Sequence, residues 1–264
     1  MTKPLRLDAE LVRRGLVASR SEAGRAIQGG KVVVRGIPVT RPATLVSPEV
    51  SITFAAPPAP FVSRGGEKLA GALDSLDVRV AERRWLDAGA STGGFTDCLL
   101  QRGAAEVVAV DVGYGQLDWQ LRNDPRVTVV ERTNVRTLIP NVLPWPADGV
   151  VADLSFISLT LVLVALKGVA TEDVDMLLLV KPQFEVGNEA VGKGGVVRDP
   201  ALWRSAIERV VQAAEGSGLG LAGATPSRLP GPAGNREFFV HLRPGVAPDR
   251  TAIDRALAEV RDEA

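Results

Sequence analysis

Short apolar runs recur from residue 61 onward, and longer amphipathic stretches separate them. Continuous apolar runs of this length are typical of strands that are buried on both faces of a parallel sheet. The predicted strands cover residues 84–87, 107–111, 127–130, 150–153, 176–180 and 238–242. The pattern therefore predicts an α/β domain with a mostly parallel, Rossmann-like sheet covered by helices on both faces.

The first 55 residues carry a different pattern, in which two short helices precede short strands. Asp8 is predicted to cap a helix over residues 9–14. Ser19 or Ser21 is predicted to cap a second helix, which runs through Ile27 and is closed by two glycines. Strands are predicted at residues 31–34 and 50–54. The segment therefore predicts a small α+β domain.

A proline- and alanine-rich run separates the two patterns, at residues 55–60. Such a run is stiff and extended, and it has no apolar periodicity from which a core could form. We therefore expect a small domain over residues 1–55, a linker over 56–62 and a larger domain over 63–264.

The net charge of the chain is zero, but the charges are unevenly distributed. Residues 1–60 carry nine lysines and arginines against four acidic residues, and the remainder is correspondingly acidic. A basic module on an acidic body suggests binding of a polyanion, although a solvated face with chance enrichment is the alternative. The candidate phosphate contacts of the module are Arg6, Arg13, Arg14, Arg20, Arg25 and Lys31. Arg64, Arg132 and Lys193 are further candidates in the larger domain.

Composition excludes several classes of protein. The single cysteine, Cys98, cannot form an internal disulfide, so the fold needs no oxidising compartment. The N-terminus lacks the apolar segment of a signal peptide, and no apolar run approaches the ~20 residues that span a bilayer. His241 lies in an apolar strand without potential metal ligands at suitable spacing, so no metal site is expected. We expect a cytoplasmic protein.

Polar and acidic residues follow the predicted strands, where α/β sheets bind ligands. A glycine-rich turn over residues 87–94 lets the backbone approach a ligand, and the helix after it favours an anion. Asp111 could hold both hydroxyls of a ribose, Asn134 could border an adenine, and Asp153 ends a fourth strand. The candidate cofactor contacts are Asp87, Gly89, Ser91, Thr92, Gly93, Gly94, Asp111, Asn134 and Asp153.

This pattern favours S-adenosylmethionine over a dinucleotide. A dinucleotide oxidoreductase would prefer Gly-x-Gly-x-x-Gly, whereas Ser91 stands in place of the second glycine and Asp87 precedes the first. The alternative is that these strand-end carboxylates only cap helices.

Four ionisable residues form a candidate catalytic set, which we call the tetrad: Lys68, Asp153, Lys181 and Glu237. Lys181 follows an apolar strand, where a charged lysine needs a partner, and Asp153 follows the neighbouring one. Two lysines and two acids could surround one ribose hydroxyl, with a neutral lysine orienting or accepting its proton. Lysines are more often ordinary surface residues, and spacing alone does not decide between the two interpretations.

Several strings resemble known families. Residues 16–23 and 27–34 resemble the S4-like RNA-binding domain, which implies recognition of structured RNA by shape and phosphates. The larger domain is similar to the TlyA family, and through it to the FtsJ-type ribose methyltransferases, in strings at 61–69, 86–97, 111–117, 152–158, 181–187 and 231–235. The resemblance covers nearly the whole chain.

The resemblance implies a class I S-adenosylmethionine-dependent methyltransferase whose Lys-Asp-Lys-Glu tetrad falls on the four residues named above. It implies methylation of cytidine 2′-hydroxyls in ribosomal RNA. Members with a full N-terminal extension act on both 16S and 23S rRNA, which implies both subunits as partners here. The chain departs from mycobacterial members in its linker, where Arg-x-Trp-Val is replaced by the residues 59–62, Ala-Pro-Phe-Val.

Two further functions compete with this one. The family name carries a haemolysin history, so a membrane-active toxin is one alternative, although no strongly amphipathic basic helix supports it. A non-catalytic ribosome-assembly factor that binds RNA with both domains is the other, and the complete tetrad disfavours it. The glycine-rich residues 187–195 fit either a loop over the active site or an ordinary solvated loop.

Overall fold

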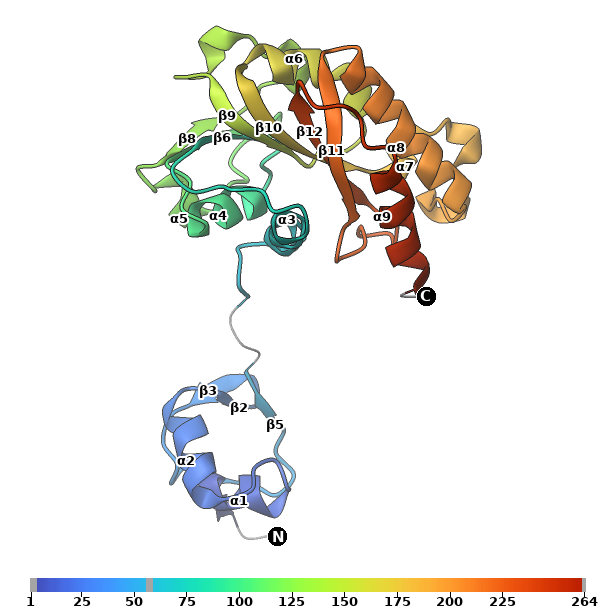
Figure 1. The fold of residues 1–264 in the computed structure, drawn as a ribbon. Coiled ribbons are helices and arrows are strands. Elements are labelled where there is room, and N and C mark those ends of the chain that lie inside the picture. The colour runs from blue at the N-terminus through green and yellow to red at the C-terminus, as the bar shows by residue number, and fades with distance from the viewer. Residues whose placement is uncertain (1–3, 56–58, 263–264) are drawn as a thin grey trace. The chain divides into compact units, whose positions relative to one another are not determined.

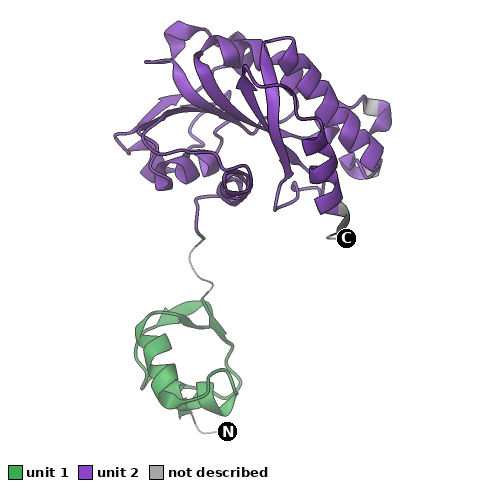
Figure 2. Ribbon diagram, viewed as in Figure 1, with its two compact units in different colours: residues 1–59 green, residues 60–264 purple. Residues whose placement is uncertain are grey.

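The computed structural model describes residues 4–55 and 59–262, with the side chains of residues 188, 193, 261 and 262 left out. The chain divides into an N-terminal unit, Met1–Ala59, and a C-terminal unit, Pro60–Ala264 (Figure 2). Within the predicted linker over 56–62, residues 56–58 lie outside the described part of the chain.

The N-terminal unit has two helices beside two small antiparallel sheets (Figure 1). Its elements are β1 (Leu5–Arg6), α1 (Leu7–Arg13), α2 (Arg20–Gln28), β2 (Val32–Val34), β3 (Ile37–Val39), β4 (Leu45–Val46) and β5 (Ile52–Phe54). β1 pairs with β4, and β2 lies between β3 and β5. Leu7, Leu11, Ile27 and Val32 are fully buried in the common core. The predicted α+β class is confirmed.

The cap predicted for the first helix is wrong. α1 begins at Leu7 with Arg6 as its N-cap, so Asp8 lies inside the first turn. The helix begins earlier because β1 leads directly into it, and the Leu7 amide donates to the Thr44 carbonyl at 2.8 Å. At the second helix, Ser19 is the cap, and its Oγ accepts from the Glu22 amide at 3.2 Å.

The C-terminal unit is built on a seven-stranded sheet in the order β11-β12-β10-β9-β6-β7-β8. The strands from β10 to β8 are parallel, whereas β12 and β11 are added antiparallel beyond β10. The bounds are β6 (Arg84–Ala88), β7 (Glu106–Val110), β8 (Val127–Val130), β9 (Ala147–Ala152), β10 (Ala170–Val180), β11 (Leu219–Pro226) and β12 (Phe238–Pro244). This confirms the predicted α/β fold with a mostly parallel sheet.

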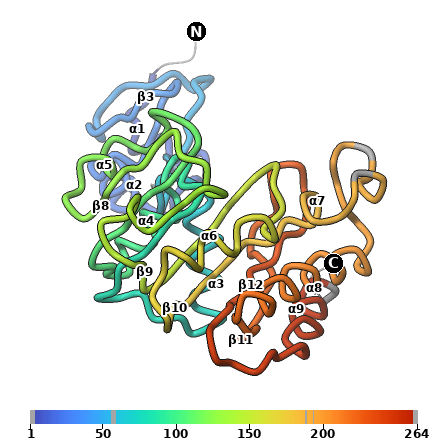
Figure 3. Tube along the Cα trace, turned by 90° about the horizontal axis from the view of Figure 1, so that it is seen from above, coloured from blue at the N-terminus to red at the C-terminus, as the bar shows by residue number. Residues whose placement is uncertain are grey.

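Helices cover both faces of this sheet (Figures 1 and 3). α3 (Arg64–Ser75), α4 (Gly94–Gln101) and α5 (Trp119–Arg122) pack on the face that contains Trp85 and Val107. α6 (Leu163–Gly168), α8 (Pro200–Glu215) and α9 (Thr251–Asp262) pack on the face that contains Leu86 and Val108. Adjacent strand residues thus enter opposite cores, as the side-chain alternation of a strand requires.

Short helices follow several strands. They are η1 (Val135–Thr137), η2 (Pro140–Val142), η3 (Leu159–Leu161), α7 (Pro182–Glu185), η4 (Asn188–Ala190) and η5 (Lys193–Gly195). Within the described residues, no helix combines the length and apolarity that crossing a membrane requires.

β11 was missed by the strand prediction because glycine and alanine dominate its sequence. The structure shows why a glycine is needed there. A Cβ on Gly220 would lie 1.9 Å from the Val246 carbonyl oxygen, so only glycine allows this approach. β10 also begins earlier than predicted, at Ala170, with an irregularity between Ala170 and Asp175.

Candidate active site

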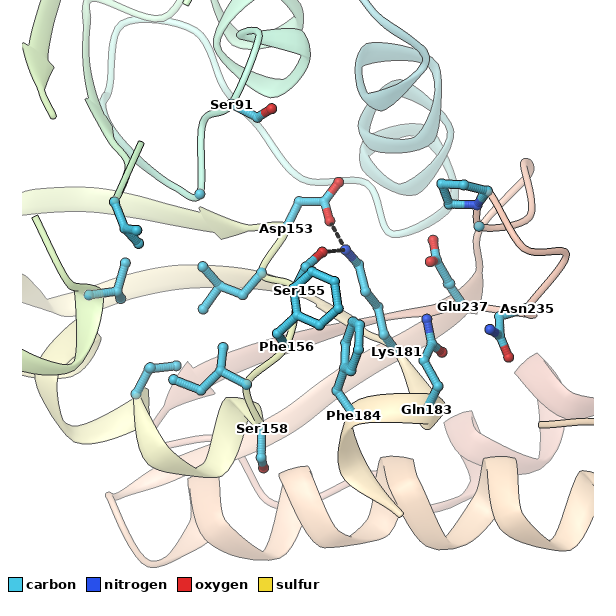
Figure 4. A pocket seen from close by; sticks show the side chains of 18 of the residues that line it. Ser91, Asp153, Ser155, Phe156, Ser158, Lys181, Gln183, Phe184, Asn235 and Glu237 are labelled. Carbon is cyan, nitrogen blue, oxygen red and sulfur yellow. Dashed lines mark hydrogen bonds and ion pairs between the residues drawn. The ribbon is translucent and has the colours of Figure 1, made fainter. Parts of the chain in front are cut away.

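A cleft of about 1510 Å³ opens where β6, β7, β9 and β10 end (Figure 4). Because these strands are parallel, the loops that follow them meet at one edge of the sheet. Gly89, Asp111, Asp153, Lys181 and Glu237 all line the cleft. A smaller pocket of about 230 Å³, lined by Lys68, Asp153 and Lys181 among others, lies beside it.

Lys181 is held by two oxygens from the loop after β9 (Figure 4). Its Nζ lies 2.5 Å from Asp153 Oδ1 and donates to Ser155 Oγ at 2.9 Å. The Asp153 contact is an ion pair, and that oxygen accepts no well-directed hydrogen bond. This oxygen is buried against the Lys181 amine at the edge of the cleft.

Lys68 and Glu237 form the second ion pair. Lys68 lies in the first turns of α3, Glu237 immediately precedes β12, and Nζ donates to Oε2 at 2.5 Å. Their side chains are only 8% and 1% exposed. A Cβ on Gly231 would lie 2.5 Å from Glu237 Oε1, so the turn over residues 230–235 closes tightly over this carboxylate. The structure thus brings all four tetrad residues to one edge of the sheet.

The glycine turn approaches the loop after β9 very closely. Gly89 has φ +86°, and a Cβ there would lie 2.8 Å from the Asp153 carbonyl oxygen. The turn is also tied to Asp111, whose Oδ2 accepts from the Ser91 amide at 2.8 Å and whose Oδ1 accepts from the Gly113 amide at 2.6 Å. Both carboxylate oxygens of Asp111 are therefore fixed by backbone donors at the cleft wall.

The remaining glycines of the turn serve packing. A Cβ on Gly93 would lie 2.3 Å from Leu121 Cδ1, and one on Gly94 would lie 2.2 Å from Ser63 Oγ. Neither glycine lines the larger cleft, although Gly94 and the exposed Thr92 line the smaller pocket.

Asp87 lies completely buried beneath the turn. Its Oδ2 accepts from Thr96 Oγ1 at 2.7 Å, whereas Oδ1 is buried without a hydrogen-bond partner. Burial raises the pKa of Asp87 to about 7. Asp87 lines neither the cleft nor the smaller pocket, so the structure does not place this predicted cofactor contact where a ligand in the cleft would touch it.

Asn134 contributes to the cleft wall and also caps a helix. Its Oδ1 accepts from the Arg136 amide at 3.0 Å, so Asn134 is the N-cap of η1. The side chain lies at the cleft, but one of its acceptor positions is already used.

Phe156 is a cleft residue that the sequence reasoning missed. It has φ +63°, in the left-handed region, and is 91% exposed. Its ring centroid lies 5.2 Å from that of Phe184, which follows Lys181 (Figure 4). A bulky residue in this conformation is a true outlier, and such outliers cluster at functional sites. No feature of the sequence predicts it.

The basic residues of the N-terminal unit divide into structural and exposed ones. Arg13 and Arg14 both pair with Glu10, whose side chain is 0% exposed, and they hold the pKa of Glu10 at about 2. Arg14 also donates to the Pro48 and Val50 carbonyls, so its guanidinium is committed to the fold.

Asp8 is the second carboxylate of this unit that is held by arginines. Arg6, with Arg20, keeps the pKa of Asp8 well below its usual range. Arg25 is exposed and donates to Ser21 Oγ at 3.0 Å, and Lys31 is exposed.

The candidate cations of the C-terminal unit are exposed where described. Arg64 begins α3, and Arg132 stacks over Tyr114 at 4.2 Å from the ring centroid. Lys193 begins η5, but its side chain lies outside the described residues. The loop of residues 187–195 is anchored by Asn235, which donates to the Gly195 carbonyl and accepts from the Val197 amide. His241 pairs with Asp175 at 2.7 Å.

Comparison with known proteins identifies both units. Residues 61–244 match the FtsJ-like methyltransferase family, and residues 5–52 match the S4 domain. The chain is 54% identical to the 16S/23S rRNA (cytidine-2′-O)-methyltransferase TlyA of Mycobacterium tuberculosis, over 98% of this chain and 94% of the relative. It is 43% identical to YqxC of Bacillus subtilis, a candidate rRNA methyltransferase, over 91% and 86% of the two chains.

A solved structure with a different name is similar to this chain over its whole length. It is a candidate hemolysin from Streptococcus thermophilus, with a TM-score of 0.76 and 36% identity, covering 100% of this chain and 98% of that one.

Proposed function

The chain belongs to the TlyA family of FtsJ-like methyltransferases, and we propose that it methylates the 2′-hydroxyl of cytidine in ribosomal RNA with S-adenosylmethionine as the methyl donor. The observation that carries this proposal is the convergence of two lysine–carboxylate pairs on one edge of the sheet. The M. tuberculosis relative is named for activity on 16S and 23S rRNA. Its similarity extends over the S4 domain, so we propose both subunits as substrates.

The cleft residues fit the proposed cofactor. Gly89 lines the cleft and presents only backbone to it, so a ligand can approach the turn closely. Asp111 would hold the ribose hydroxyls from the end of β7, and Asn134 would border the adenine. When bound, the cofactor supplies a methyl group on a sulfonium, which needs alignment more than activation.

The tetrad residues would act on the acceptor hydroxyl. Asp153 and Ser155 fix Nζ of Lys181, so this amine can hold the 2′-oxygen and, in its neutral form, accept its proton. Glu237 fixes Nζ of Lys68 in the same way. Phe156 offers an exposed aromatic face on which the base of the target nucleotide could stack.

RNA would be captured by both units. The exposed arginines and Lys31 of the N-terminal unit, which matches the S4 domain, suit phosphate contacts. Arg64 and Arg132 extend the candidate contacts to the C-terminal unit.

The test is transfer of a labelled methyl group to isolated small and large ribosomal subunits from a strain that lacks the modification. Wild type should label both, and Lys181→Ala should label neither. Lys167→Ala is the control, because Lys167 Nζ donates to the Thr171 and Glu172 carbonyls and lines neither cavity. Absence of label with wild type, despite cofactor binding, would overturn the ribosomal substrate.

The hemolysin name on a relative motivates one additional arm. Wild type is incubated with dye-loaded vesicles of anionic and neutral lipid. Release of dye at the concentrations used for methyl transfer would support the membrane alternative, and no release is expected.

A further inference from the structure

The loop that carries Phe156 is fastened by the segment that begins with Lys181. Lys181 Nζ donates to Ser155 Oγ at 2.9 Å, and the Phe184 ring packs against the Phe156 ring (Figure 4). These contacts join the segment after β10 to the segment after β9. Both contacts restrain the loop at Ser155 or at Phe156 itself. Neither of them restrains the chain after Phe156.

Glu185 supplies the missing restraint. It is the last residue of α7, and its Oε2 accepts from Ser158 Oγ at 2.5 Å while Oε1 accepts from the Leu159 amide at 2.8 Å. Ser158 Oγ in turn lies 2.7 Å from Thr160 Oγ1. Both oxygens of the Glu185 carboxylate therefore accept hydrogen bonds from the start of η3, shortly after Phe156.

Burial of the Glu185 carboxylate is destabilising, which indicates that its hydrogen bonds do more than fill space in the core. Glu185 is 3% exposed, and burial raises the pKa of its carboxyl group. Within the described residues, no lysine or arginine forms an ion pair with it. Arg209 donates to its backbone carbonyl at 2.9 Å, and the charge of this arginine offsets the effect of burial only in part. A buried carboxylate that forms no ion pair is destabilising unless its hydrogen bonds are needed.

We propose that Glu185 is a positioning residue for methyl transfer, which holds Phe156 at the cleft and keeps Ser155 in place for Lys181. A left-handed phenylalanine persists only where its surroundings over-determine the backbone, and the Glu185 bonds provide that determination. The inference rests on the proposed function, because Phe156 matters only if a nucleotide enters the cleft.

The experiment compares two variants of similar size. Glu185→Met removes both acceptors, and the single-turnover rate should fall by about 10- to 100-fold, because small misplacements at a reacting site have effects of that order. The Kd for S-adenosylmethionine should not change. Hydrogen exchange should become faster at the Leu159 amide and its neighbours, and not elsewhere in the C-terminal unit.

Glu185→Gln is the conservative variant. Its amide can accept from Leu159 and donate to Ser158 Oγ, since the Ser158–Thr160 hydroxyl pair can reverse its direction. It should therefore keep most of the wild-type rate. Ser158→Ala, which removes one of the two bonds, should lower the rate with an unchanged cofactor Kd even if Glu185→Met fails to fold.

Three results would overturn the proposal: a wild-type rate in folded Glu185→Met, equal losses of rate in Glu185→Met and Glu185→Gln, or cofactor binding that weakens in parallel with the rate. Failure of wild type to methylate ribosomal RNA would instead contradict the proposed function. In that case the exchange measurement at Leu159 still shows whether Glu185 restrains the loop.

Discussion

Lys181 Nζ lies 2.5 Å from Asp153 Oδ1, and the two residues directly follow neighbouring parallel strands, β10 and β9. The register of these strands pairs Leu178 with Ala152, so β9 ends directly before Asp153, whereas β10 continues through Val180 before Lys181. The fold therefore delivers this ion pair without a dedicated loop. Its position at the cleft makes Lys181 the most direct target for mutation.

Lys181→Met should lower the single-turnover rate of methyl transfer by roughly 10²- to 10⁴-fold, the range typical of a lost acid–base group. Methionine keeps the length of the side chain but cannot bind the 2′-oxygen. Cofactor affinity, measured by calorimetry, should stay near the wild-type value because Gly89 and Asp111 are untouched. A variant that loses cofactor binding and catalysis together would place Lys181 in the cofactor site instead.

Gly89→Ala should abolish measurable binding of S-adenosylmethionine. The new Cβ would lie 2.8 Å from the Asp153 carbonyl oxygen. The alanine would also have to adopt the left-handed backbone conformation of Gly89, which costs about 1–2 kcal/mol. Gly115→Ala is the matched control, because Gly115 also has positive φ, at +71°, but no atom within 4 Å of its Cβ position. Equal loss of cofactor binding in both variants would assign the effect to backbone strain alone.

The N-terminal unit should lose stability in acid. Its arginines lower the pKa of Glu10 to about 2, so the stabilisation is complete above the ordinary glutamate pKa of 4.5 and is lost as the pH falls from there toward 2. The urea midpoint of the Ile27 and Ile52 methyl signals in NMR should fall between about pH 6 and about pH 3. Glu10→Gln should have a lower urea midpoint at about pH 6, and its midpoint should change less with pH. A midpoint that changes with pH as much as in wild type would contradict this account.

The C-terminal unit should show the opposite dependence through Asp87. Burial raises its pKa to about 7, so the folded state binds a proton more readily than the unfolded state. The stability is therefore highest below the ordinary aspartate pKa and declines as the pH rises toward about 7. Asp87→Asn should raise the Tm more at about pH 8 than at about pH 5, measured through tryptophan fluorescence. Equal shifts at both pH values would show that Asp87 is not protonated more readily in the folded state.

Phe156→Ala should reduce methyl transfer to RNA by about 10-fold or more, on the scale of ~1–3 kcal/mol for a lost base stack. The ring is 91% exposed, so the Tm should hardly change. Phe156→Gly separates ring from backbone, because glycine also relieves the left-handed conformation. Activity in the glycine variant equal to wild type would exclude stacking on this ring.

Sequence patterns predicted the fold class because buried parallel strands have a clear apolar signature, as at Val107 and Val150. They also predicted that Asp153 and Lys181 would meet, since both follow such strands. They missed β11, where close approach to Val246 requires a glycine of low strand propensity, and misplaced the cap at Asp8. Phe156 and Glu185 were beyond prediction because a left-handed backbone and a buried carboxylate depend on tertiary contacts. The roles of the tetrad residues stay predictions.

The most direct test of the central claim is nucleoside mass spectrometry of ribosomal RNA from unmodified subunits after incubation with the protein and S-adenosylmethionine. The account predicts that 2′-O-methylcytidine appears with wild type, is absent with Lys181→Met, and appears normally with Lys167→Ala. A methyl group on a base, on another nucleoside, or on cytidine at equal levels with Lys181→Met would contradict it.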